Sequence, residues 1–111
     1  MENIKLRNEN NPQKRISTQM RAVLTLLQSD QELLRAVNQH IDLNTESIYW
    51  DQIFAKSWSS GQRALLTWGF NLWRDENRKG ASSFELALGM DQKFQLAILN
   101  ALAVRWGIQA A

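Results

Sequence analysis

Apolar residues recur every three or four positions through most of the chain from residue 16 onward, a spacing that places them on one face of an α-helix. A cap at Ser17 predicts a first helix to about residue 28, with an apolar face of Ile16, Met20, Val23, Leu24 and Leu27. The segment 29–32 has the serine-to-glutamate pattern of a capping box. It predicts a second helix with an apolar side of Leu33, Leu34, Val37 and Ile41.

The middle of the chain predicts two more helices. A cap at Asn44 or Thr45 predicts a third helix to about residue 58, with a stripe of Tyr49, Trp50, Ile53, Phe54 and Trp58. Ser59 and Gln62 form another capping box, which predicts a fourth helix over about 60–77. Its apolar residues span an arc of about 200°, so we expect contacts on two sides. The other face is expected to hold Arg63, Thr67, Asn71, Arg74 and Arg78.

Glycines mark three positions of interest in the second half of the chain. Gly69 lies at the centre of the fourth helix's apolar arc, where a crossing helix could approach closely. Gly89 is expected to end a short helix that begins near residue 82. Asp91 then caps a final helix that runs to about Trp106 and closes at Gly107. This last helix is apolar nearly all round, so we expect other helices or a second chain to enclose it.

These patterns predict an all-α protein. The segment 16–111 is expected to form a compact single-domain bundle of five or six helices, since no strand-type alternation, hairpin dipeptide or repeat is evident. Residues 1–15 hold four asparagines and the chain's only proline, Pro12, and predict a flexible N-terminal tail.

Composition sets the broad class. Apolar residues at 44% and charged residues at 22% are ordinary for a globular protein, and the absence of cysteine excludes disulfides and thiolate zinc sites. The N-terminus has no apolar run of the signal-peptide type, and no stretch of about 18 apolar residues is present. We therefore expect a cytoplasmic protein without a membrane segment.

The charge pattern bears on nucleic-acid binding. The net charge is +2, but residues 1–21 hold five basic and two acidic side chains, so the basic excess lies in the polar lead-in. A nucleic-acid-binding domain usually carries such an excess on one folded face. This distribution weakens that interpretation.

Catalytic chemistry has little support in the sequence. His40 is the only histidine and lies at the edge of a helix face, while Glu46, Glu85 and Asp91 fall in expected first turns, where negative charge favours the helix dipole. Arg74, with Arg78 and Lys79, forms a small basic cluster that complements a helix C-terminus. We expect a protein that is not an enzyme and uses no metal or cofactor.

Five tryptophans carry the main hypothesis, that the protein binds another protein or a second copy of itself as a homo-oligomer. Trp50, Trp68, Trp73 and Trp106 fall on faces that another helix is expected to cover. The candidates for partner binding are the residues whose apolar character is least accounted for by packing in the core, namely Ile48, Trp58 and Gly69.

The alternative is a nucleic-acid-binding regulator. The segment 82–106 resembles a helix-turn-helix at the turn around Gly89, and the contacts would come from Lys14, Arg15, Gln92 and Lys93. The final helix is otherwise hydrophobic, whereas a helix in the major groove needs an exposed polar face. The outward face of this helix therefore separates the hypotheses: buried for self-association, exposed and polar for nucleic-acid binding.

Overall fold

The protein is described from a computed structural model, which covers residues 16–74, 87 and 89–108. The tail at 1–15 and most of the short helix expected near 82–89 lie outside these residues. The elements in chain order are α1 (Thr18–Leu27), α2 (Gln31–Asn38), β1 (Ile41–Asp42), β2 (Ser47–Ile48), α3 (Trp50–Phe54), α4 (Ser60–Arg74) and α6 (Gln92–Trp106). The described chain is mostly helical, as predicted, with two short strands.

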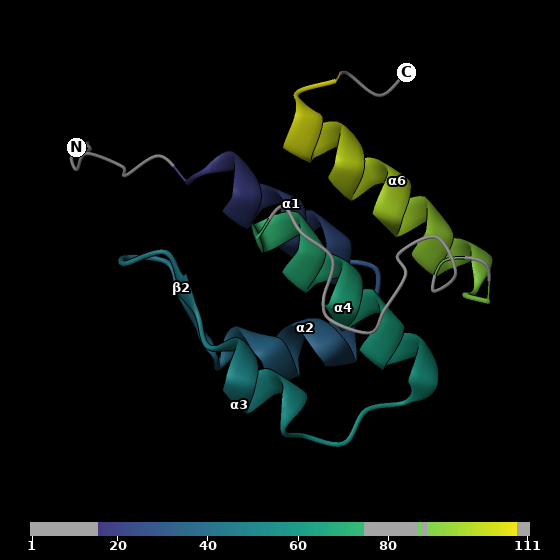
Figure 1. Cartoon of the computed structure of the whole chain (residues 1–111), viewed down its shortest axis with the longest axis horizontal. Helices are drawn as coiled ribbons and strands as arrows, with labels where there is room; N and C mark the ends of the chain where they lie inside the picture. Colours follow the sequence, from purple (N-terminus) through teal and green to yellow (C-terminus); the bar gives the residue numbers. More distant parts are fainter. Residues whose placement is uncertain (1–15, 75–86, 88, 109–111) are drawn as a thin grey trace, which may run out of the picture.

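Helix α1 forms the centre of the core. It packs against α6 and α4 over much of its length and contacts α2 at its end. In Figure 1 it runs antiparallel to both α4 and α6, which lie beside it. Of the apolar face predicted for it, Met20, Val23 and Leu27 are buried, while Ile16 and Leu24 are half-buried. Ala22 and Leu26, which the prediction did not include, are buried as well.

Helix α4 is packed on two sides, as its wide apolar arc predicted. A Cβ atom added at Gly69 would lie 3.4 Å from Leu26 Cδ2 of α1 and 3.4 Å from Trp50 Cη2 of α3. The glycine therefore lies where two neighbouring elements come close to the helix backbone. The expectation that Thr67 and Asn71 face away is wrong, since both are buried. The Thr67 hydroxyl donates to the carbonyl of Arg63 within the helix, which lets this polar side chain lie inside.

Aromatic rings join α3 to α4. Trp50 and Phe54 stack with ring centroids 6.0 Å apart, and Phe70 meets Trp50 edge to face at 5.5 Å. The Arg74 guanidinium lies 5.8 Å from the Phe70 ring centroid. Offset and edge-to-face geometries are the ones that the ring quadrupoles favour, so this cluster adds specific attraction to its burial.

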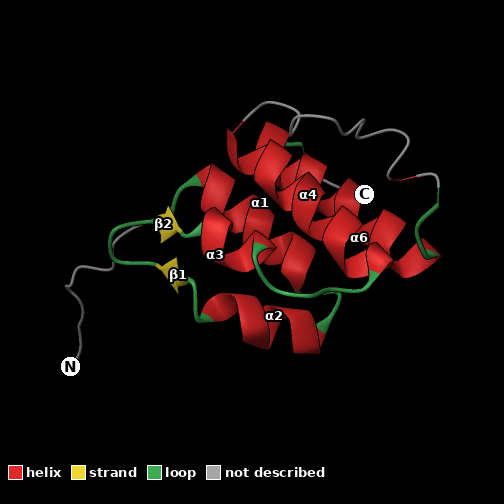
Figure 2. Cartoon of the chain, turned by 60° about the horizontal axis from the view of Figure 1, so that its bottom comes forward, coloured by secondary structure: helices red, strands yellow, loops and turns green. Residues whose placement is uncertain are grey.

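The segment 41–48 corrects the prediction of an all-α chain. Ile41 pairs with Ile48 and Asp42 with Ser47 in an antiparallel hairpin, which Figure 2 shows beside α3. The Asp42 carboxylate accepts from the amides of Asn44 and Thr45 and stabilises the turn. The third helix consequently spans only five residues, and the second helix ends before Ile41.

Glu46 connects the hairpin to the start of helix α1. It adopts the left-handed region with φ 53°, and its carboxylate accepts a hydrogen bond from the Ser17 amide at 3.1 Å. The sequence had assigned Glu46 to the first turn of its own helix. The structure places it instead at the N-terminus of α1, where negative charge is equally favourable.

Two predicted N-caps are confirmed, whereas the cap predicted at Asn44 or Thr45 is wrong, because the third helix begins after Tyr49. Ser17 accepts from the Met20 amide, and Ser59 and Gln62 exchange reciprocal hydrogen bonds at 3.1 Å. The cap of α2 is one residue later than expected, since Asp30 accepts from the Leu33 amide and Ser29 donates back to Leu26. The short helix that Gly89 is expected to end lies mostly outside the described residues, and Gly107 is the glycine with positive φ among those described.

Candidate protein-interaction face

Hydrogen bonds fix both ends of helix α6. Asp91 occupies the N-cap position, although its side chain makes no capping hydrogen bond. The Gln95 side chain donates to the Ala87 carbonyl at 2.8 Å. At the other end, Gly107 adopts φ 71°, and the amides of Gly107 and Ile108 bond to Val104 and Ala103 as in a Schellman motif.

One side of α6 packs into the core. Phe94, Ala97, Ile98 and Ala101 are buried, and α1 is the principal neighbour of the helix. The Arg105 Nε donates to the Leu72 carbonyl of α4 at 3.2 Å, which directs this cation toward the body of the protein. The small residues let the two backbones approach while the larger ones fill the space between them.

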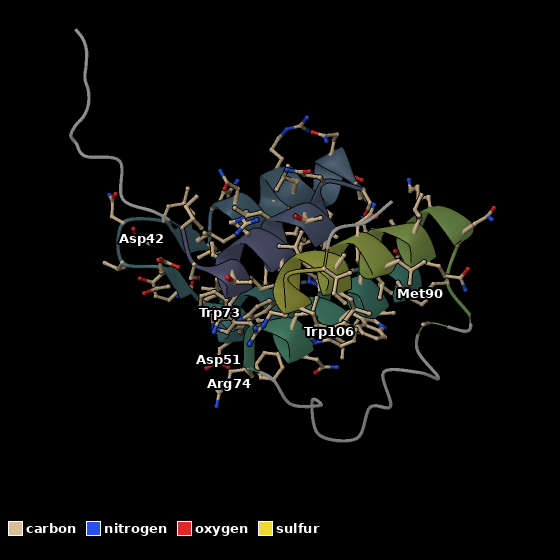
Figure 3. The ribbon with its side chains drawn as sticks, turned by 90° about the horizontal axis from the view of Figure 1, so that it is seen from above. Asp42, Asp51, Trp73, Arg74, Met90 and Trp106 are labelled. Carbon is tan, nitrogen blue, oxygen red and sulfur yellow. The ribbon has the colours of Figure 1, made fainter. Side chains whose placement is uncertain are left out.

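The opposite side of α6 is apolar and exposed. Leu96, Leu99, Ala103 and Trp106 fall within an arc of about 80° on the helical wheel. Leu96, Leu99, Trp106 and the following Ile108 are between 57% and 65% exposed, while Ala103 is half-buried. Figure 3 labels Trp106 at the C-terminal end of the helix and Met90 just before its start. We call Leu96, Leu99, Ala103, Trp106 and Ile108 the α6 apolar face.

The α6 apolar face holds no charged side chain, and the whole of α6 has no acidic residue. Lys93 lies at its N-terminal edge, with its ammonium 5.3 Å from the Phe94 ring centroid. A shallow hollow of about 430 Å³ opens there between Gln92, Lys93, Gln95, Leu96 and Leu99. A molecule bound to this face would therefore be held by apolar contacts rather than by ion pairs.

The predicted partner-binding residues lie elsewhere and are largely enclosed. Ile48 is 9% exposed in β2, and Gly69 is buried beneath Leu26 and Trp50. Trp58 is half-buried against the core, and its indole Nε1–H donates to the Ile53 carbonyl at 2.8 Å. The structure gives each of them a packing contact within the fold.

Trp106, in contrast, is more exposed than the sequence predicts. The helical wheel placed it on a face that another helix covers, whereas 65% of its surface is exposed. One signal in the sequence pointed to this face: α6 is apolar nearly all round, more than a helix with one covered side needs.

The residues of the nucleic-acid alternative are only partly described. Lys14 and Arg15 lie outside the described residues. Gln92 and Lys93 are exposed in the first turn of α6, and the outward face that continues from them is apolar rather than polar.

A second hollow, of about 560 Å³, lies where the first turns of α4 and α6 meet Asp30. Burial raises the pKa of Asp30. The Leu33 amide, the Gln62 side chain and the charge of Lys93 lower it by more, so the net pKa is below the usual value. The Gln62 amide lies 3.3 Å from Asp30 Oδ2 and joins the starts of α2 and α4. These contacts give Asp30 a structural role as a helix cap.

His40 also serves the fold. Its Nδ1 lies 3.0 Å from Gln52 Oε1, and its carbonyl accepts from the Tyr49 amide at the base of the hairpin. In the described part of the chain, no group of three or more histidine and acidic side chains is placed to hold a metal ion.

Comparison with known proteins adds no relative: no family model, curated protein or solved structure matches the chain. Among the helices of the described ranges, none has the length and apolar character needed to cross a bilayer.

Proposed function

We propose that the protein acts by binding another protein chain through the α6 apolar face. The observation that carries the proposal is the exposure of Leu96, Leu99, Trp106 and Ile108 on one side of a helix whose other side is buried. Burial of these side chains against a partner would contribute about 25 cal/mol of hydrophobic free energy for each Å² covered. Tryptophan is among the residues that contribute most to protein interfaces.

The surroundings of the face support protein binding over nucleic-acid binding. Phosphate contacts need cations that point outward, and base contacts need exposed polar side chains. On α6 the Arg105 Nε bonds to the Leu72 carbonyl, and the outer stripe is apolar. The core of a protein interface, by contrast, is depleted of charge and enriched in aromatic residues.

Site-specific photo-crosslinking in the cells that naturally produce the protein tests this proposal. A photoreactive phenylalanine analogue at Leu99 is expected to give a discrete protein adduct, identified by mass spectrometry. The same analogue at Leu43 is the matched control, since this leucine is also exposed but lies in the hairpin turn.

A second substitution, Leu96→Glu, should abolish the Leu99 adduct, because a carboxylate in the face opposes apolar contact. The proposal is overturned if the Leu99 position gives no discrete adduct, if Leu43 gives the same adduct, or if Leu96→Glu leaves the yield unchanged.

A further inference from the structure

We infer that the occupant of the α6 apolar face is the same face of a second copy of this chain, paired antiparallel. This inference rests on the proposed function and names its partner. Two observations support a second copy, the symmetry of the stripe and the charges at its ends, and the area that the face offers sets the expected strength of pairing.

The stripe has a spacing that reads the same in both directions. Its helical members follow one another at intervals of three, four and three residues, through Leu96, Leu99, Ala103 and Trp106. A twofold axis level with Ala101 therefore brings each member opposite another member. Leu96 meets Trp106 of the second copy, and Leu99 meets its Ala103. In a twofold interface every such contact occurs twice, so one self-complementary stripe is sufficient.

Side-chain size suits this register. The small Ala103 leaves space opposite Leu99 near the twofold axis, where the two helices come closest. The large Trp106 lies at the end, opposite Leu96, where its ring can cover the leucine. Alternation of large and small side chains across facing positions is how two helices interdigitate at a separation of about 8–10 Å.

The charges at the ends favour the antiparallel direction. Lys93 would lie beside the C-terminal end of the second copy's α6, where the helix dipole attracts a cation. The two Lys93 residues would be about 24 Å apart along the axis, well beyond the screening length of about 8–10 Å. A parallel pair would instead place the two lysines side by side and align the two helix dipoles unfavourably.

The area on offer predicts a reversible dimer. The four exposed apolar side chains present surface on the order of 500 Å² per copy, as large as the largest patch on many monomers. Two such faces bury less than the roughly 1,200–2,000 Å² of a stable, specific complex. We therefore expect dissociation in the micromolar range, with monomer and dimer both populated.

Sedimentation of the purified full chain over a range of concentrations measures this equilibrium. The wild type is expected to move from monomer to dimer between about 1 and 500 µM, since small interfaces bind weakly. Leu99→Glu should weaken dimerisation at least tenfold, because two carboxylates would then meet near the twofold axis. Leu43→Glu is the control and should leave dimerisation unchanged, because this exposed leucine lies in the hairpin turn.

A charge-reversal pair separates direct contact from loss of folding. Leu99→Glu and Leu99→Lys should each be monomeric alone, with wild-type circular dichroism, and should form a heterodimer when mixed. A mixture that stays monomeric over the range in which the wild type dimerises would count against Leu99 as a contact across the axis.

Spin labels measure the direction of pairing, and the absence of native cysteine lets single-cysteine variants be labelled cleanly. Gln92→Cys labels should be about 30 Å apart in an antiparallel pair but only about 10 Å apart in a parallel one. Asn100→Cys labels lie next to the axis in the antiparallel register, so they should show strong dipolar broadening. Broadening at Gln92 equal to that at Asn100 would overturn the antiparallel arrangement.

Failure of this inference can be told from failure of the proposed function. A chain that remains monomeric at 500 µM, the upper end of the range expected for a small interface, overturns self-pairing. If the Leu99 photo-adduct then contains a different protein, the proposed function stands. An adduct of twice the 12.8 kDa chain mass, containing this chain alone, supports both. No adduct and no dimer together remove both.

Discussion

Trp50 and Trp106 are both predicted from the sequence to be covered by another helix, but truncating them should lower the stability of the protein by very different amounts. Trp50 is 8% exposed and packs against two phenylalanine rings, whereas Trp106 is 65% exposed. We expect Trp50→Ala to lower the free energy of unfolding by about 3–5 kcal/mol, the range for a large aromatic side chain removed from a core. Trp106→Ala should cost about 1 kcal/mol, because only a third of its surface is covered, at about 25 cal/mol per Å².

Urea unfolding followed by tryptophan fluorescence measures both values, since four tryptophans remain in each variant. The protein should be kept near 1 µM, below the concentration at which we expect α6 to pair. Because the whole domain is stabilised by only about 5–15 kcal/mol, Trp50→Ala could fail to fold. Trp50→Phe and Trp106→Phe form a milder pair, with expected losses of about 1–2 kcal/mol and less than about 0.5 kcal/mol.

Equal losses of stability at the two positions would contradict the difference in burial between Trp50 and Trp106. That result would mean that Trp106 is covered in the monomer, and the proposal for the α6 apolar face would lose its basis.

Three further predictions concern the fold. Ser59→Ala and Gln62→Ala should each lower the free energy of unfolding by about 0.5–2 kcal/mol. The double variant should lose less than the sum of the two, because the side chains share one capping box; thermal unfolding measures this, and strict additivity would contradict it. Trp58→Phe should cost about 1 kcal/mol through loss of the hydrogen bond to the Ile53 carbonyl, so an unchanged urea midpoint would show that this bond contributes nothing. The lowered pKa of Asp30 means that its ionised form favours folding: the contribution is complete above the unfolded-state pKa near 4 and is lost as the pH falls through the lower folded-state value. Urea midpoints between pH 5 and pH 2 should therefore fall more steeply for the wild type than for Asp30→Asn, and parallel curves would contradict that assignment.

Local signals were predicted well because their causes lie within a few residues. The caps at Ser17 and at Ser59 with Gln62 involve partners three positions away, and the closing turn at Gly107 needs only the freedom of a glycine at positive φ. Helical periodicity likewise identified Met20, Val23 and Leu27 on the buried side of α1, and the two-sided packing of α4.

The hairpin at 41–48 was missed for a physical reason. Its strands have two residues each, too few for an alternating pattern to stand out. The Tyr49-to-Phe54 periodicity that follows is genuinely helical, and the expected helix was extended back from it through the turn. What holds the turn in place is a contact between Glu46 and Ser17, 29 residues apart, which no local pattern encodes.

The spacing of apolar residues specifies which side chains share a face of each helix, because the helical repeat follows from backbone geometry alone. It thereby indicated a mainly helical fold, its caps, and a last helix with more apolar surface than one neighbour can cover. Which of these faces is covered depends on how the helices pack against one another, and no local pattern specifies that packing. Trp58 packs against the core and Trp106 is exposed, so the candidate interface lies on α6 rather than at Ile48, Trp58 or Gly69.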